Sequence, residues 1–189
     1  IFAEDRTVLS GGNFHGQPIA IVLDVLAIAL TTVGNLSERR VTRLLDPKLN
    51  SGLPPFLVLS PKEAGLRSGL MTSQYSAAAL ASENKILAHP ASVDSIPTSA
   101  DFEDFVSMGP AAALKLMRIV ENVRHILSIE LACGAQAAEA RGTENLGPAS
   151  AQTFRFVRTS VARLEADREI STDIVRLARA LREEAFGIA

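Results

Sequence analysis

The chain has 189 residues and is 47% hydrophobic, which is enough apolar material to bury a core and predicts one globular domain or slightly more. Its 19 basic and 21 acidic residues give a formal net charge of -2, so it lacks the positive field that drives non-specific nucleic-acid binding. Its single cysteine, Cys133, excludes an internal disulfide and cannot build a zinc site with three widely spaced histidines, so we expect a reducing, cytoplasmic setting.

The first predicted helix follows a glycine turn. Gly11 and Gly12 predict a turn after a short extended segment. Pro18 suits the first helical turn, where its missing N–H is not needed. Apolar residues then recur at helical spacing as far as Leu45, and Pro47 prevents the helix from continuing. We therefore predict a helix from near residue 17 to near residue 46.

Within that helix, residues 19–33 are almost free of charge. The stretch is shorter than the roughly 20 apolar residues of a membrane span, and Asp24 near its middle would be costly in a bilayer. We therefore predict no membrane contact, but a helix that is buried on most sides, in a bundle or between subunits.

The positions of proline and glycine define the segments that follow. Residues 48–70 are rich in both and are predicted to be a connector. A second helix is expected over residues 71–89, where several alanines allow close packing and Pro90 ends the helix. Residues 91–107 form a polar loop, and such loops often carry chemistry. A third helix is expected over residues 110–141.

The third helix is long for a chain of this size. At about 1.5 Å per residue it would extend on the order of 45 Å, so we expect it to pack against other chains or other parts of a larger protein. Two amphipathic helices are predicted after Gly147, the second capped by Ser171 or Thr172. The predicted fold class is all-α, a long-helix bundle, with residues 148–189 as a helical pair packing on residues 1–147.

Taken alone, the residues with chemical potential suggest little. Residues 65–69 lack the lysine and the spacing of a phosphate-binding loop, so a turn is expected. Glu103 and Asp104 are neighbours whose side chains should diverge, so they are not a paired acid and base. His15 would ordinarily be a structural hydrogen-bonding group, and Phe14 part of a core.

Five short motifs change this interpretation because they occur together and in one order. They are SGGNFHG at residues 10–16, GNLSERR at 34–40, LPPFL at 53–57, ASENK at 81–85 leading into HPASVDS at 89–95, and PTSA at 97–100 continuing to EDFVSMG at 103–109. Together they resemble the C-terminal part of the histidine ammonia-lyase family, whose relatives include phenylalanine and tyrosine ammonia-lyases and aromatic aminomutases. The resemblance covers nearly all of residues 2–141, and more loosely the final helices.

The resemblance implies a nonoxidative elimination of ammonia from an aromatic L-amino acid. The electrophile of the family is 4-methylidene-imidazol-5-one, which forms from an internal Ala-Ser-Gly tripeptide, and this sequence contains no Ala-Ser-Gly. We therefore expect the C-terminal portion of an ammonia-lyase-type helical fold, with residues 1–147 as the C-terminal half of the lyase core. Such a fragment would arise by proteolysis, truncation or a two-chain arrangement. It should be inactive without its N-terminal half.

The resemblance also implies site residues. Phe14 matches a position that lines the active site beside the prosthetic group, and Asn13 and His15 shape the same loop. Glu103 matches the catalytic acidic position that faces the substrate imidazole in the histidine enzymes, where a carboxylate accepts an imidazole N–H and favours the cation. Phe102 and Phe105 depart from the glutamine and histidine common there, and Phe102 is expected to contact substrate.

Several interpretations stay open. L-Histidine, giving urocanate, is the first expected substrate, but the added aromatic surface would also suit a tyrosine or phenylalanine ammonia-lyase or an aromatic 2,3-aminomutase. The family further implies a homotetramer whose long helices form a central bundle. A noncatalytic helical assembly module, in which the motifs persist for packing alone, is the alternative from another class.

Overall fold

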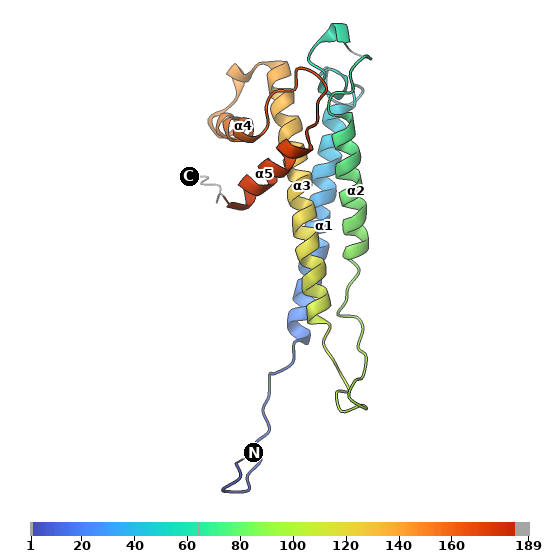
Figure 1. Ribbon diagram of the computed structural model, residues 1–189, viewed down its shortest axis with the longest axis vertical. Coiled ribbons are helices and arrows are strands. Elements are labelled where there is room, and N and C mark those ends of the chain that lie inside the picture. Colours follow the sequence, from blue (N-terminus) through green and yellow to red (C-terminus); the bar gives the residue numbers. More distant parts are fainter. Residues whose placement is uncertain (1, 64, 184–189) are drawn as a thin grey trace.

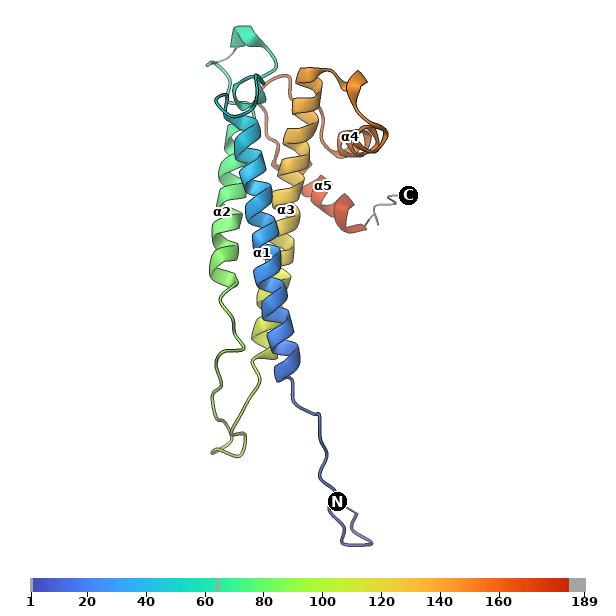
Figure 2. The same ribbon diagram turned by 180° about the vertical axis from the view of Figure 1, so that it is seen from behind.

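The computed structural model describes residues 2–63 and 65–183, and over these residues the fold is all-helical with no strand. Helices α1 (Gln17–Leu45), α2 (Met71–Leu87) and α3 (Gly109–Arg141) lie side by side and form a long stem (Figures 1 and 2). Helices α4 (Pro148–Ser160) and α5 (Ser171–Glu183) lie across one end of this stem. The predicted all-α bundle of long helices is confirmed.

The helix boundaries follow from local signals. Proline occupies the first turn of α1, α3 and α4, where the backbone N–H groups have no helical partner. Helix α2 ends at Leu87, two residues before the expected end at His89, although Ala88 and His89 still donate their N–H groups to carbonyls of the last turn. Three short 3₁₀ turns, η1 (Pro55–Leu57), η2 (Pro61–Glu63) and η3 (Thr143–Asn145), interrupt the connectors.

A stripe of small side chains brings α1 close to α3. Ala20, Ala27 and Gly34 recur every seven residues on one face of α1 and are buried. A Cβ atom added at Gly34 would lie 3.2 Å from Cγ2 of Val123 on α3, which leaves little room for a side chain. The two longest helices pack closely, and a small hydrophobic core lies between them toward the lower end of the stem.

The larger core lies at the other end of the stem. It joins the C-terminal half of α1, the connector, the second half of α3 and the last two helices, through residues such as Leu45, Leu57, Ile126 and Leu177 that are fully buried. Burial of each such side chain contributes about 1.5–3 kcal/mol relative to exposure. The C-terminal helical pair therefore shares a core with the stem. The division of the chain at residue 147 stays a prediction.

One expectation about helices is corrected, and another is not met within this single chain. Ser171 and Thr172 are the first two residues of α5, and the Ser171 hydroxyl donates to the Glu169 carboxylate at 2.5 Å, so neither occupies the capping position predicted for one of them. The first half of α1 is not buried on most sides within this chain, because Ile19, Val22 and Val25 are 64%, 64% and 61% exposed. The reason is that α2 and α3 cover only one side of it (Figure 2).

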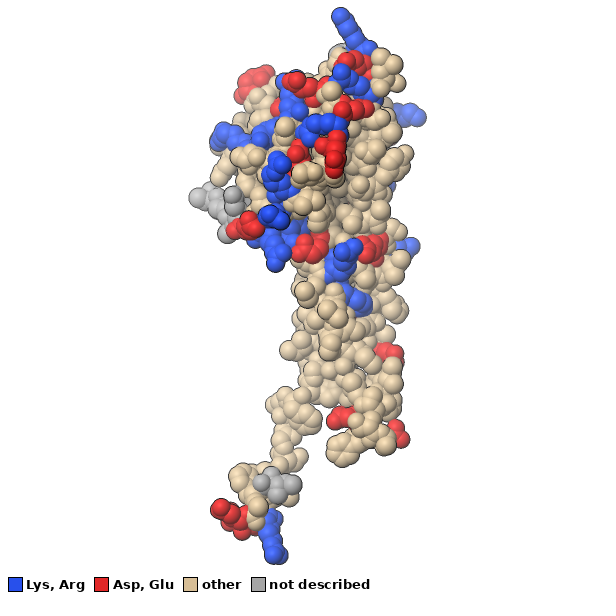
Figure 3. All heavy atoms as spheres, in the orientation of Figure 1, with Lys and Arg blue, Asp and Glu red and all other residues tan. Residues whose placement is uncertain are grey.

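Helix α1 as a whole is longer than the uncharged stretch considered in the sequence. By length and composition alone it could cross a membrane, and 28% of its most apolar window is buried. In Figure 3 most charged side chains gather over the end of the stem that carries α4 and α5, whereas the lower half of the helical stem is nearly uncharged above the loops. Helix α3, by contrast, is mostly buried or half-buried. Burial of both helices among several chains stays a prediction.

Candidate functional site

The two loops that carry the predicted site residues lie at the same end of the stem. Residues 2–16 precede α1, and residues 88–108 connect α2 to α3, so both emerge where α1 and α3 begin (Figures 1 and 2). The helical stem thus brings together two motifs that are far apart in the sequence.

His15 and Phe105 join the two loops directly. Their rings stack with centroids 5.3 Å apart, and His15 Nε2 lies 2.7 Å from the Phe105 carbonyl oxygen. The Gln17 backbone N–H donates to His15 Nδ1 at 3.1 Å, which fixes the tautomer, so Nε2 carries the proton and donates to Phe105. Next to this contact, a Cβ atom added at Gly16 would lie 2.8 Å from Ser107 Oγ. Any side chain at this position would displace the Ser107 hydroxyl, so the two loops are close together here.

Ser92 is the second point at which the loop is attached to α1. Its N–H donates to Asp24 Oδ2 at 2.8 Å, and its carbonyl oxygen accepts from Gln17 Nε2 at 2.9 Å. Lys115 of α3 faces the same carboxylate, with Nζ 3.5 Å from Asp24 Oδ1. Burial raises the pKa of Asp24, but the Ser92 hydrogen bond and the Lys115 ammonium outweigh it, and the pKa is lowered overall. Asp24 is therefore a buried anion.

The hairpin that carries Phe102 and Glu103 is closed by backbone hydrogen bonds. Thr98 and Glu103 exchange N–H to carbonyl bonds at 3.0 and 3.2 Å. Three residues at its tip, 99–101, have φ between 54° and 64°, a region that non-glycine residues seldom adopt. At its base, Ser95 Oγ accepts from the Val106 N–H at 3.0 Å and donates to the Val106 carbonyl at 3.2 Å.

The four predicted site residues are all exposed in this chain. Phe14 and Phe102 are 87% and 86% exposed, and Asn13 and Glu103 are exposed as well. Over the part of the chain that the structure describes, no side-chain hydrogen bond or ion pair links Glu103 to Asn13. The structure therefore brings their loops to one end of the stem without enclosing a cavity around them. Their assignment to an active site stays a prediction.

Sequence reasoning missed two polar groups beneath these loops. Asp24 was considered only as a charge unfavourable to a membrane span, although an isolated carboxylate in an apolar helix was itself a signal of a buried partner. Within the ASENK motif, Glu83 accepts from Asn122 Nδ2 at 2.7 Å and pairs with Arg118 of α3 at 3.2 Å, and these hydrogen bonds lower its pKa. This contact ties α2 to α3.

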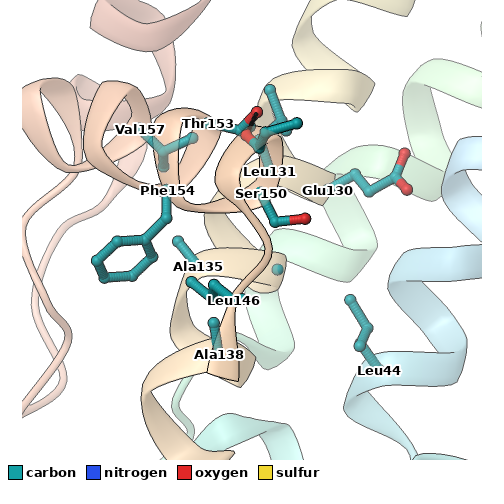
Figure 4. Close-up of a pocket in the computed structure, with 12 residues that line it drawn as sticks. Leu44, Glu130, Leu131, Ala135, Ala138, Leu146, Ser150, Thr153, Phe154 and Val157 are labelled. Carbon is teal, nitrogen blue, oxygen red and sulfur yellow. Dashed lines mark hydrogen bonds between the residues drawn. The ribbon is translucent and has the colours of Figure 1, made fainter. Parts of the chain in front are cut away.

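The pocket in Figure 4 is a separate feature. It has a volume of about 380 Å³ and lies between α3, α4 and the end of α1. Its lining is mainly apolar, and Glu130 at its edge already accepts from Ser37 at 2.6 Å and pairs with Arg40. None of the four predicted site residues lines it. We therefore place the candidate site at the loops at the opposite end.

Comparisons of the sequence with protein families and with individual proteins agree with one another. The model of the family described as aromatic amino acid lyase matches residues 1–159. The histidine ammonia-lyase of Geobacillus kaustophilus is 55% identical over 185 residues, which are 98% of this chain and 36% of the relative. That of Symbiobacterium thermophilum is 54% identical over 178 residues, 94% of this chain and 34% of the relative. The chain spans about a third of the length of these relatives.

Solved structures agree with this similarity. Histidine ammonia-lyase from Trypanosoma cruzi superposes with a TM-score of 0.86 at 46% identity, covering 94% of this chain and 34% of that one. Tyrosine aminomutase from Streptomyces globisporus superposes with a TM-score of 0.88 at 42% identity, covering 95% of this chain and 34% of that one. The fold of this chain is therefore a portion of an ammonia-lyase fold.

Proposed function

The chain belongs to the aromatic amino acid lyase family, and from that premise we propose that it is the C-terminal part of a histidine ammonia-lyase that eliminates ammonia from L-histidine to give urocanate. It is a partial homologue of histidine ammonia-lyase, 55% identical over 98% of its length. That identity is the observation that carries the proposal. We expect the complete enzyme to be cytoplasmic.

The family uses a methylidene-imidazolone electrophile, and this sequence contains no Ala-Ser-Gly from which to form it. We propose that the group lies in the N-terminal half of the enzyme and meets the loop end of the stem. The exposed rings of Phe14 and Phe102 and the exposed Glu103 carboxylate fit that arrangement, because flat apolar surfaces and a free acceptor suit an aromatic substrate beside a planar group. When bound, the electrophile would activate the amino group as a leaving group.

Each predicted site residue then has a defined task. Glu103 accepts an N–H of the substrate imidazole and favours its charged form, which orients the ring. Phe14 supplies a steric wall, and Asn13, at a φ of 59°, shapes the turn that presents it. Phe102, whose ring is 86% exposed, supplies a further apolar surface for the substrate ring.

Phenylalanine and tyrosine lyases and aromatic 2,3-aminomutases are the alternative within the family. Phe102 and Phe105, the two departures from the histidine pattern, would support these alternatives. The environments of their two rings differ, however. Phe105 is stacked on His15, whereas Phe102 is 86% exposed and available to a ligand. The added aromatic surface that a substrate would meet is therefore mainly that of Phe102, and Glu103 beside it favours histidine.

Assembly is a further part of the proposal. We propose a homotetramer in which the apolar face of α1, including Ile19, Val22 and Val25, is covered by other subunits. A noncatalytic assembly module would also use that face, so the two functions are separated by activity and not by association.

Complementation tests the proposed function. We would combine this chain with the N-terminal two-thirds of the Geobacillus kaustophilus enzyme and follow urocanate by ultraviolet absorbance. Restored deamination of histidine is expected. Glu103→Gln should then lower kcat/KM for histidine by about 10- to 100-fold relative to tyrosine, because a charge-assisted hydrogen bond contributes about 1.5–3 kcal/mol.

The control is Asp104→Asn, which removes the neighbouring exposed carboxylate and should leave kcat/KM unchanged. A folded complex without deamination would favour the noncatalytic module. A complex that prefers tyrosine, and in which Glu103→Gln has no effect, would favour the alternative substrates.

A further inference from the structure

Ser92 is attached to α1 at both its backbone donor and its backbone acceptor. Asp24 accepts its N–H and Gln17 donates to its carbonyl oxygen, at 2.8 and 2.9 Å. These two α1 side chains are about two helical turns apart, so they lie on one face of the helix and hold the loop along its length. A residue held in this way has a fixed position relative to the stem.

Lys115 extends the attachment to α3. Its ammonium faces Asp24 Oδ1 at 3.5 Å and donates to the His89 carbonyl oxygen. That carbonyl lies just beyond the end of α2, where backbone acceptors lack helical partners and cations are favourable. Asp24, at 3% exposure, therefore lies between a loop N–H, which donates to Oδ2, and an ammonium group, which faces Oδ1 as an ion pair without a hydrogen bond.

The position of Ser92 determines where the hairpin begins. Ser95, three residues later, closes the base of the hairpin through its two hydrogen bonds with Val106. The other side of that base is held by the contact of His15 with Phe105. These attachments on both sides restrict the positions that the hairpin can take relative to the stem. The hairpin carries Phe102 and Glu103 near its tip.

We propose that Asp24 is a positioning residue for the loop that carries Glu103, acting through the Ser92 backbone with Lys115 as its counter-ion. The proposal deepens the proposed function and rests on it for the role of Glu103. Asp24 does not touch substrate. Its effect is to keep the Glu103 carboxylate at one place relative to Phe14, because small displacements of a positioning group reduce turnover strongly.

A purely structural role would have a different signature. Buried ion pairs contribute little to global stability when compared with apolar replacements, and removing one partner destabilises the fold as a whole. A positioning role instead predicts a local effect, confined to residues 91–107 and accompanied by a loss of turnover. The experiment must therefore measure the loop, the remainder of the fold and the kinetics separately.

Hydrogen exchange of the full chain measures the first two. Asp24→Asn keeps an amide oxygen for the Ser92 N–H but turns an N–H₂ group toward the Lys115 ammonium. Exchange of the amides of residues 91–107 should rise at least about tenfold, while those of residues 148–183 stay unchanged. In the double variant Asp24→Asn with Lys115→Met the ammonium no longer opposes the amide N–H₂ group, and protection of the loop should largely return.

Glu38→Gln is the matched control. Glu38 is also 3% exposed and lies about four turns further along α1, but its carboxylate accepts from Thr42 at 2.9 Å and pairs with Arg39, not with the loop. It should leave exchange of residues 91–107 unchanged. Equal loosening of the loop by both variants, or no loosening by Asp24→Asn, would overturn the proposal. So would a parallel loss of protection throughout the chain.

Kinetics of the complemented enzyme complete the test. Asp24→Asn should lower kcat for histidine by about tenfold or more with a smaller change in KM, and the double variant should recover part of it. A loosened loop with an unchanged kcat would overturn the positioning role. Absence of activity in the wild-type complex would instead contradict the proposed function, and the exchange result would still decide whether Asp24 holds the loop.

Discussion

Gly69 occupies a position where glycine is required for two separate reasons. Its φ is 54°, in the left-handed region, and a Cβ atom there would lie 2.5 Å from the carbonyl oxygen of Phe56. The Leu70 N–H donates to the same carbonyl at 3.0 Å, so the oxygen is held in place and cannot easily move away. The turn at the end of the connector therefore depends on the absence of a side chain.

The two causes can be separated by a pair of alanine variants. Gly52 also has a positive φ, 88°, but nothing lies within 4 Å of an added Cβ. Gly52→Ala should cost about 1 kcal/mol from the backbone conformation alone, whereas Gly69→Ala should cost about 3 kcal/mol or more because the clash is added. Urea unfolding measures both. Equal costs would show that the approach of Phe56 is unimportant.

At the scale of elements, Gln136 joins α3 to the segment that leads into α5. It is 1% exposed; its Nε2 donates to the Leu164 carbonyl at 2.8 Å, and its Oε1 accepts the Leu164 N–H at 3.1 Å. One amide side chain thus completes the hydrogen bonding of a buried residue that no helix or strand satisfies.

Gln136→Leu keeps a side chain of similar size and removes both bonds to Leu164, together with the longer ones to Leu57 and Arg158. It should reduce the free energy of unfolding by about 2–3 kcal/mol, because the Leu164 N–H and carbonyl are left buried without partners. It should also speed exchange in residues 161–170. Gln152→Leu, at an exposed position of α4, should change stability by less than about 0.5 kcal/mol. Similar effects of both variants would contradict the structural role of Gln136.

The elements were predictable where the sequence carries local signals. Pro18, Pro110 and Pro148 lie in first turns, and Gly142 follows the end of α3. The interactions that attach the elements to one another were not predictable, because a hydrogen bond such as that of Gln136 to Leu164 joins groups whose proximity only the fold creates. For the same reason, the stacking of Phe105 on His15 could not be inferred from their spacing. The site residues themselves came from the family resemblance.

At the scale of the whole molecule, one chain does not cover the apolar part of α1 that the sequence predicts to be buried in a bundle or between subunits. The apolar stretch of α1 was expected to be covered, yet α2 and α3 of the same chain leave one side open. Figure 3 shows that the lower half of the stem is also almost free of charge on the side where α3 lies in front of α1. Isolated apolar side chains on a surface are ordinary, but a continuous face of them on one helix marks an interaction site.

In the proposed homotetramer this face is an interface between copies of the chain. Val22 and Val25, 64% and 61% exposed, are three residues apart and so project from the same side of α1. Val22→Glu with Val25→Glu would place two charges in a desolvated interface and should shift the chain from an oligomer to a monomer, measured by sedimentation equilibrium. Helical content should be unchanged, because both positions face away from α2 and α3.

Leu66→Glu provides the control, since Leu66 is 85% exposed in the connector and outside this face, and it should leave the oligomer intact. A wild-type chain that is monomeric at micromolar concentration and binds phosphatidylcholine vesicles would assign the face to a membrane instead. Self-association that the double variant does not reduce would place the interface elsewhere on the molecule. Loss of association only in the double variant would explain why the first half of α1 exposes Val22 and Val25 while its one carboxylate, Asp24, is buried against Lys115 of α3.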